Sequence, residues 1–194
     1  MLNQRKTITL RTSITGLVLT ALFAALISAG AFITVPIGPV PFVLQNFFTL
    51  LSGLVLGPFL GAMAVALFIV AGAIGVPVFS NNGSPMGIAR LIGPTGGFYL
   101  GYFLGAIVAG LVIGFPRQGE KIKVWRLALA VVLGGLTVYI PGLIRLKFFL
   151  ETWPKTFAAG FFPFLIGDAI KGVVAALIAP RLRRAAARQV TGSR

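Results

Sequence analysis

The sequence predicts an all-α membrane protein whose single domain, residues 1–194, is a six-transmembrane-helix bundle. Hydrophobic residues make up 57% of the chain and charged residues only 10%, and the mean hydropathy of +0.99 is far above that of a water-soluble domain of this size. The apolar residues also form runs close to the about 20 residues that a helix needs to cross a bilayer. A soluble domain is therefore excluded, and the lipid bilayer is the first expected partner.

Six apolar runs, separated by turn residues and charge clusters, define the expected helices. Prolines follow the first run within Val35–Pro41, Gly57-Pro58 divides the second run from the third, and a long connection, 75–95, precedes the fourth. The second and third runs are short and tightly joined, which is also compatible with one hairpin. Pro141 interrupts the fifth run, Val124–Leu150, and the charged residues Arg145 and Lys147 indicate that its membrane portion ends near there. The expected helices cover approximately 13–35, 41–56, 58–75, 96–115, 124–147 and 161–179.

The basic residues predict how the bundle is oriented. Seventeen Lys and Arg against three Asp and Glu give a net charge of +14, but they form short clusters between apolar runs, which orient a membrane protein rather than bind nucleic acid. With both termini on one side of six helices, that side receives twelve basic residues and the other side four. Positive segments stay in the cytoplasm, so both termini are expected there, and 180–194 is expected to be a solvated basic cytoplasmic tail. A signal peptide is the alternative for the first run, which exceeds the about 7–15 apolar residues of such segments.

The residue types that are absent narrow the chemistry. The chain has no Cys and no His, which removes disulfides, thiolate chemistry, imidazole proton relays and the usual zinc or haem ligands. Of its three acidic residues, Glu120 and Glu151 fall in joints between apolar runs, so paired-carboxylate catalysis is not expected. No Gly-x-x-x-x-Gly-Lys-Ser/Thr motif for ATP phosphates occurs. We therefore expect no catalytic residues, no metal site and no enzyme activity, and any ATP-driven work needs a partner.

Asp168 and Lys171 are the foremost candidate site residues. They stand three residues apart inside the last apolar run, so on a helix they share one face and can meet each other or a common ligand. Each charge near the centre of a membrane helix costs about 2.5–3.5 kcal/mol. One interpretation is an ion pair that only fixes helix packing. The interpretation we favour is a carboxylate and an ammonium group that hold a small polar molecule, in a site that opens outward.

Further polar candidates are expected near the same outer end: Gln45, Asn81, Asn82, Arg90 and Tyr99. The asparagines and the arginine lie in the connection Val76–Thr95, which is long for a tight bundle and is predicted to form a lid. An ordinary Asn-Gly turn and an interfacial arginine anchor are the alternatives. The glutamine faces either the same cavity or a neighbouring helix. The tyrosine either walls the ligand or belongs to an interfacial aromatic belt.

Small residues spaced by four positions predict close approaches between helices. The stripes Gly53–Gly61 and Gly97–Ala109 are interpreted as internal packing faces. A third stripe on the first helix also suits an exposed face that docks another membrane subunit; its members are Ala21, Ala25 and Ala29.

With these residues in place, the sequence resembles the biotin-binding S subunits, the BioY family, of energy-coupling-factor (ECF) vitamin transporters. The likeness covers roughly Leu17 to Ala179 and depends on several short stretches together. They are Pro39–Pro41 followed by Gln45, Gly53–Pro58 with Gly61, Gly72–Phe79, Gly93–Gly97 with Gly101, and Gly167–Lys171.

The resemblance implies a six-helix S component in a bacterial cytoplasmic membrane that captures biotin from outside. It also implies partners: a transmembrane coupling (T) subunit and two ATP-binding cassette ATPase subunits, with biotin as the transported ligand and no cofactor. By the same resemblance Asp168 and Lys171 contact the vitamin, Asn81 or Asn82 contributes from the loop, and the alanine stripe meets the coupling subunit. Two rival functions stay open, a stand-alone biotin or small-molecule carrier driven by an ion gradient and a structural membrane subunit without ligand.

Overall fold

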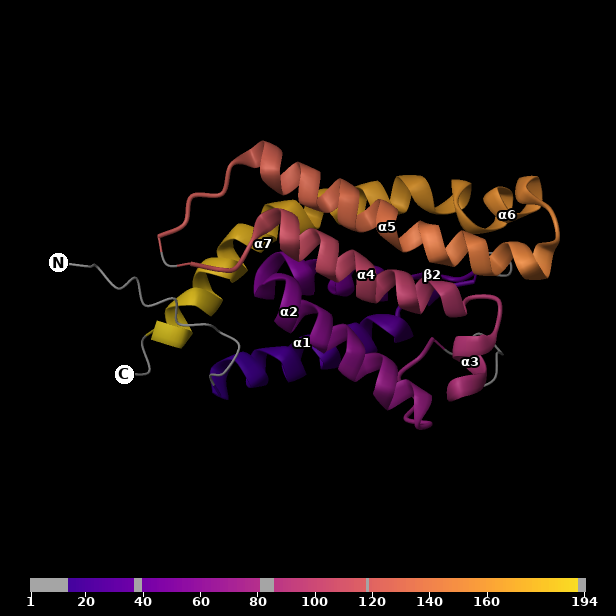
Figure 1. The fold of residues 1–194 in the computed structure, drawn as a ribbon, viewed down its shortest axis with the longest axis horizontal. Helices are drawn as coiled ribbons and strands as arrows, with labels where there is room; N and C mark the ends of the chain where they lie inside the picture. Colours follow the sequence, from indigo (N-terminus) through magenta and orange to yellow (C-terminus); the bar gives the residue numbers. More distant parts are fainter. Residues whose placement is uncertain (1–13, 37–39, 81–85, 118, 192–194) are drawn as a thin grey trace.

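The structure, a computed structural model, describes residues 14–36, 40–80, 86–117 and 119–191, and helices dominate it (Figure 1). The elements in chain order are α1 (Ile14–Phe32), β1 (Thr34–Val35), β2 (Phe42–Val43), α2 (Gln45–Ala73), α3 (Ile88–Ile92), α4 (Gly96–Ile113), α5 (Val124–Leu150), α6 (Trp153–Gly160), the 3-10 helix η2 (Phe162–Phe164) and α7 (Leu165–Thr191).

Five segments of the described chain are long and apolar enough to cross a membrane: α1, α2, α4, α5 and the stretch Trp153–Arg188, which holds α6 and most of α7. Large apolar side chains such as Val70, Leu111 and Ile144 are exposed on their outer faces. A large exposed apolar surface suits lipid rather than water. Helices can also lie in lipid because they satisfy their own backbone hydrogen bonds. The chain is therefore a multi-pass membrane protein.

Within α2 the chain turns back at Gly57-Pro58, so that the two halves lie side by side. Gly57 has a φ of 83°, in the left-handed region that glycine tolerates, and Pro58 lacks the N–H that would continue the helix. Ser52 Oγ donates to the carbonyl oxygen of Gly61 at 3.2 Å. Residues nine apart in a straight helix are separated by about 13 Å along the axis. The turn coincides with the break expected between the second and third helices, so α2 consists of two helical segments.

The two ends of the bundle differ in what they contain (Figure 1). At one end, which we call the site end, lie both ends of α2, the short helices α3 and α6, and the antiparallel pair β1–β2, with Thr34 opposite Val43. At the opposite end lie the start of α1, the Gly57 turn, the connection from α4 to α5 and the C-terminal part of α7. The first described helix, α1, thus begins at the same end at which the last one, α7, finishes.

Glycines bring α4 close to both of its neighbours, α2 and α5. A Cβ added to Gly53 on α2 would lie 2.3 Å from the carbonyl oxygen of Ala106 on α4, and one added to Gly101 on α4 would lie 2.3 Å from that of Val138 on α5. Real Cβ atoms do not approach so closely, so a larger residue would push the helices apart. The two glycine stripes are internal packing faces, as their spacing predicts.

The last two long helices differ from the expected ones. α5 runs without interruption through Pro141 to Leu150, because a membrane helix that loses one backbone hydrogen bond at a proline gains nothing by unwinding further in lipid. The last apolar run starts with η2, which contains Pro163, and its long helix begins only at Leu165. That helix then continues through Pro180 to Thr191, beyond the expected end at 179.

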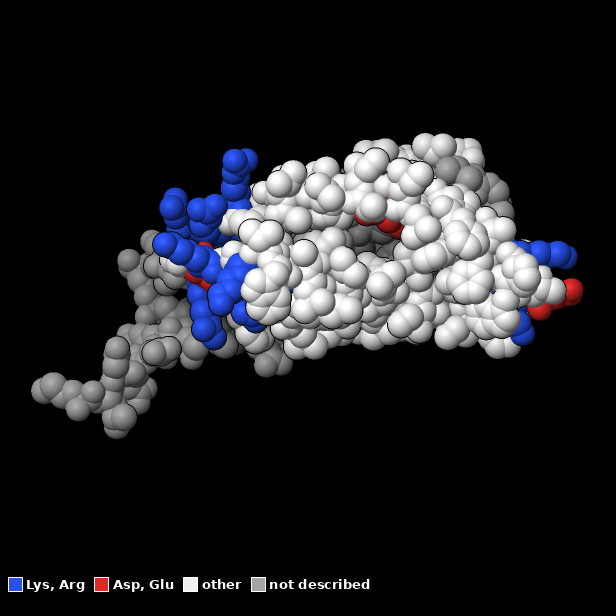
Figure 2. Space-filling model, turned by 90° about the horizontal axis from the view of Figure 1, so that it is seen from above, with Lys and Arg blue, Asp and Glu red and all other residues white. Residues whose placement is uncertain are grey.

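Basic side chains gather at the end opposite the site end, next to a long uncharged surface (Figure 2). The expectation of a solvated tail at 180–194 is wrong for Arg183, which is 2% exposed. Its Nη1 donates to the carbonyl oxygen of Leu54 at 2.8 Å and its Nη2 to that of Gly114 at 2.8 Å, and its Nε lies 3.2 Å from Glu120 Oε2. Leu54 is the residue four before Pro58, whose missing N–H leaves this carbonyl free for the arginine.

Candidate ligand-binding site

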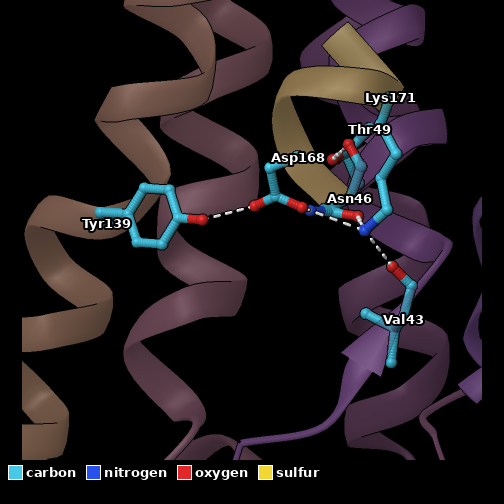
Figure 3. A network of polar contacts seen from close by, with 6 residues as sticks. All are labelled: Val43, Asn46, Thr49, Tyr139, Asp168 and Lys171. Atoms are coloured by element: carbon cyan, nitrogen blue, oxygen red, sulfur yellow. Dashed lines mark hydrogen bonds and ion pairs between the residues drawn. The ribbon is translucent and has the colours of Figure 1, made fainter. Parts of the chain in front are cut away.

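Asp168 and Lys171 lie one turn apart on α7 and face the start of α2 (Figure 3). The ammonium nitrogen of Lys171 is 3.0 Å from Asp168 Oδ1. It also donates to the carbonyl oxygen of Val43 and to Asn46 Oδ1, each at 2.8 Å. The three N–H donors of the lysine thus have three acceptors, and the ring centroid of Phe42 lies 3.7 Å away in a cation–π contact. Lys171 is held in one position by these contacts.

Asp168 keeps part of its hydrogen-bonding capacity. Its Oδ1 accepts from Lys171 and, at 2.9 Å, from Asn46 Nδ2, while its Oδ2 accepts from the hydroxyl of Tyr139 on α5. A carboxylate offers about four acceptor positions, so one position on Oδ2 has no donor among the described residues. The second N–H of Asn46 Nδ2 has no acceptor among the described residues. This cluster therefore presents both an acceptor and a donor to a molecule beside it.

The polar cluster lines a narrow cavity of about 30 Å³ between α2, α4, α5 and α7. Phe98, Val138 and Phe164 supply apolar walls. The side chain of Asp168 is 24% exposed and that of Lys171 10%, and Figure 2 shows acidic atoms inside a hollow of the otherwise uncharged face. A concave apolar pocket with a few convergent polar groups is typical of a small-molecule site.

A second narrow cavity, of about 20 Å³, lies beside Arg90, which α3 carries into the bundle. Arg90 is 3% exposed; its Nη2 donates to Ser80 Oγ at 3.0 Å and its Nε to the hydroxyl of Tyr99 at 3.4 Å. Arg90 Nη1 and Gln45 Nε2 are buried and have no hydrogen-bond partner among the described residues, none of whose carboxylates pairs with Arg90. A buried cation without an anion costs several kcal/mol. The two unpartnered donors therefore indicate a place for an anionic group.

The two cavities are adjacent, because Val40, Pro41, Val43, Phe98 and Tyr102 line both of them. Neutral and charged hydrogen-bonding groups lie at the Asp168 end, aromatic and aliphatic side chains in the middle, and a cation at the Arg90 end. This order matches an elongated ligand with a polar head, an apolar body and an anionic tail.

Most of the site residues predicted from the sequence come together here: Gln45, Arg90, Tyr99, Asp168 and Lys171. Arg90 and Tyr99 are buried rather than interfacial, so neither the anchor nor the aromatic-belt interpretation describes them. Asn81 and Asn82 lie outside the described residues. The alanine stripe lies on an exposed face of α1, and none of its members lines either cavity.

Sequence reasoning did not select Asn46, Tyr139 or Ser80. The first two are polar residues inside apolar runs, which is a usable signal in a membrane protein. Their partner Asp168 is 122 residues from Asn46 and 29 from Tyr139, so the sequence gives no indication that they meet. Ser80 precedes the asparagines that drew attention to the loop.

The fold and the site together define an integral membrane protein with cavities lined by polar and charged groups at one end of a helix bundle. Comparison with known proteins assigns the family. The family model described as BioY family matches residues 3–188, and the chain belongs to this family, as the resemblance of its motifs predicts.

Individual relatives agree with this assignment along nearly the whole chain. The biotin transporter BioY of Thermotoga maritima is 44% identical over 168 residues, 87% of this chain and 95% of the relative. The probable biotin transporter BioY of Pyrococcus horikoshii is 41% identical over 165 residues, 85% of this chain and 94% of the relative. A crystal structure of the S-component for biotin from an ECF-type ABC transporter matches with a TM-score of 0.75 at 27% identity, covering 95% of each chain.

Proposed function

We propose that this chain is the biotin-binding S subunit of an ECF transporter, a transport subunit rather than an enzyme. The observation that carries the proposal is a single site with unused hydrogen-bonding groups at Asp168 and Asn46 and an unpaired, buried cation, Arg90, at its other end. Relatives at 44% and 41% identity are named as biotin transporters, and the matched crystal structure is an S-component for biotin.

The chemistry of biotin fits the order of groups along the site. Its ureido ring has two N–H donors and one carbonyl acceptor, which the free acceptor position of Asp168 and the free N–H of Asn46 complement. Its thiophane ring and valeryl chain suit the apolar walls around Phe98 and Tyr102. Its carboxylate supplies the anion that Arg90 lacks, with Gln45 as a second donor. Lys171 acts mainly by holding Asp168 in place.

The distribution of charge supports an outward-facing site in a bacterial cytoplasmic membrane. The basic end of the bundle, where α1 begins and α7 ends, carries most of the Lys and Arg of the described residues and is expected to face the cytoplasm (Figures 1 and 2). Both termini are then expected to be cytoplasmic, and the site end faces outward. Energy then has to come from partners, since the sequence has no phosphate-binding loop. A coupling subunit and two ATPase subunits fill this role, and the exposed stripe Ala21, Ala25 and Ala29 is a suitable face for the coupling subunit.

Isothermal titration of the detergent-purified chain with biotin tests the proposal. Asp168→Asn and Lys171→Ala are expected to lose binding, because each breaks a charge-assisted contact of about 1.5–3 kcal/mol in a cluster that acts as a unit. Glu151→Gln, which changes an exposed acid at the same end of the bundle, is the matched control and is expected to bind normally. Unchanged affinity in both site variants would remove the site assignment. Uptake in cells that lack ATPase partners would favour the gradient-driven carrier instead.

A further inference from the structure

A groove on the outer surface, separate from the ligand cavities, lies near the site end between α2, α4 and α5. We call it the lateral groove; its volume is about 710 Å³. Its walls are almost entirely apolar, with Val70 from α2, Leu100 and Phe103 from α4, and Ile144 and Phe148 from α5. Most of these side chains are exposed at the surface. An apolar recess of this kind in a membrane surface is filled by an apolar chain rather than by water.

The length of the lateral groove corresponds to about two-thirds of one leaflet of a bilayer. Along α4 it extends from Gly96 to Phe103 and along α5 from Pro141 to Phe148, which at 1.5 Å per residue is about 10 Å in each case. One leaflet contributes about 15 Å to the hydrocarbon core. The groove is therefore long enough for the upper two-thirds of an acyl chain that enters from the site end.

A cation stands where the head group of such a lipid would lie. Arg145 lines the groove; its Nε donates to the carbonyl oxygen of Gly93 at 3.3 Å, its Nη2 donates to that of Ile92, and its guanidinium carbon lies 5.2 Å from the ring of Phe149. Its Nη1 has no hydrogen-bond partner among the described residues, and none of their carboxylates pairs with it. Arg145 is thus pre-positioned, with the two N–H groups of Nη1 left for an anion.

We infer that the lateral groove holds one acyl chain of an anionic phospholipid, whose phosphate is bound by Arg145. The apolar walls select a hydrocarbon chain, and the unpaired guanidinium selects a negative head group over a zwitterionic one. The short helix α3 connects this lipid to the ligand site. It carries Arg90 into the ligand cavity, while its next two residues, Leu91 and Ile92, line the lateral groove. Tyr99 lines both spaces, so the lipid packs behind groups that face the ligand.

Native mass spectrometry of the full chain, released from nanodiscs with equal amounts of phosphatidylglycerol and phosphatidylcholine, tests this inference. The wild type is expected to retain one phosphatidylglycerol in preference to phosphatidylcholine. Arg145→Ala is expected to reduce that preference about fivefold, the effect of one basic group near a lipid surface, and Arg145→Lys to preserve most of it. Lys147→Ala and Lys155→Ala, which change cations of the same end that lie outside the groove, are matched controls and are expected to behave as the wild type.

Val70→Trp keeps the charge but fills the lateral groove, so it is expected to lose the retained lipid of either kind. This variant also decides the matter if Arg145→Ala does not fold, since Val70 is an exposed side chain whose enlargement leaves the helix contacts intact. Equal retention of the two lipids by the wild type would overturn the inference. Full retention of phosphatidylglycerol by Val70→Trp, or by a folded Arg145→Ala, would also overturn it.

Discussion

Arg90→Met is the substitution that separates the ligand's carboxylate from the rest of the site. In the free protein Arg90 is a buried cation that has two hydroxyl partners and an unpartnered Nη1. Methionine has a similar length and no charge, so it fills the space without creating an ion. The variant is expected to weaken biotin binding while leaving the ligand-free protein at least as stable as the wild type, a combination that a general packing defect does not produce.

The size of each effect follows from the geometry. One hydrogen bond to a charged group contributes about 1.5–3 kcal/mol, so losing the contact between Nη1 and a carboxylate weakens binding by roughly 10- to 150-fold. The ligand-free protein loses an uncompensated buried charge, whose desolvation costs several kcal/mol. It also loses the donors to Ser80 and Tyr99, whose hydroxyl groups can reorient. The net change in melting temperature is therefore expected to be zero or positive.

A thermodynamic cycle with the neutral amide of biotin isolates the contact. Titration calorimetry of the wild type is expected to show the amide binding about as weakly as Arg90→Met binds biotin, and Arg90→Met is expected to bind the two ligands alike. Tyr139→Phe serves as the control, because it changes the other end of the site and is expected to weaken both ligands by the same factor. If Arg90→Met bound biotin as tightly as the wild type does, the carboxylate assignment would be refuted. It would also be refuted if the substitution weakened biotin and its amide by the same factor relative to the wild type.

Three further substitutions test other parts of the structure. Tyr139→Phe removes the hydroxyl that donates to Asp168 Oδ2 and is expected to weaken biotin binding about tenfold by calorimetry, a loss of about 1.4 kcal/mol; unchanged binding would show that the contact is dispensable. Gly101→Leu places a side chain against the backbone of Val138 and is expected to abolish monodisperse protein in size-exclusion chromatography. Gly135→Leu is the control and is expected to be tolerated, because a Cβ added there meets nothing within 4 Å. Equal behaviour of the two variants would contradict the packing. Arg183→Met leaves Glu120 and two carbonyl oxygens without their donor and is expected to reduce the free energy of unfolding by about 3 kcal/mol, visible as a lower melting temperature. Arg184→Met, which changes an exposed arginine, is the control. Equal melting temperatures of the two variants would exclude a structural role for Arg183.

The helices and the central pair of the site were accessible from the sequence because lipid makes both conspicuous. Long apolar runs leave few alternatives to membrane helices, and Gly57-Pro58 marks a turn that has no other simple explanation. Asp168 and Lys171 stand out because charges are costly inside an apolar run. The short helices α3 and α6 gave no such signal, because five and eight residues are too few for a recognisable period.

The features that the sequence did not predict depend on contacts between distant segments. Arg183 was expected to be solvated because it stands among other arginines, and its acceptors are mostly backbone carbonyls, which no residue pattern reveals. Arg90 looked equally suited to an interface or to a site, and only its burial without an anion distinguishes the two. Asn46 and Tyr139 become site residues through the packing of α2 and α5 around α7, which periodicity along one helix does not determine.

Identification of the small molecule that accompanies the purified protein tests the central claim most directly. The protein, expressed in cells grown with biotin, is purified in detergent and denatured, and the released compounds are analysed by mass spectrometry. We expect biotin in a ratio close to one per chain, and none from Asp168→Asn prepared in the same way. Wild-type protein that binds no added biotin and releases only a compound without a ureido ring or a carboxylate would contradict the account.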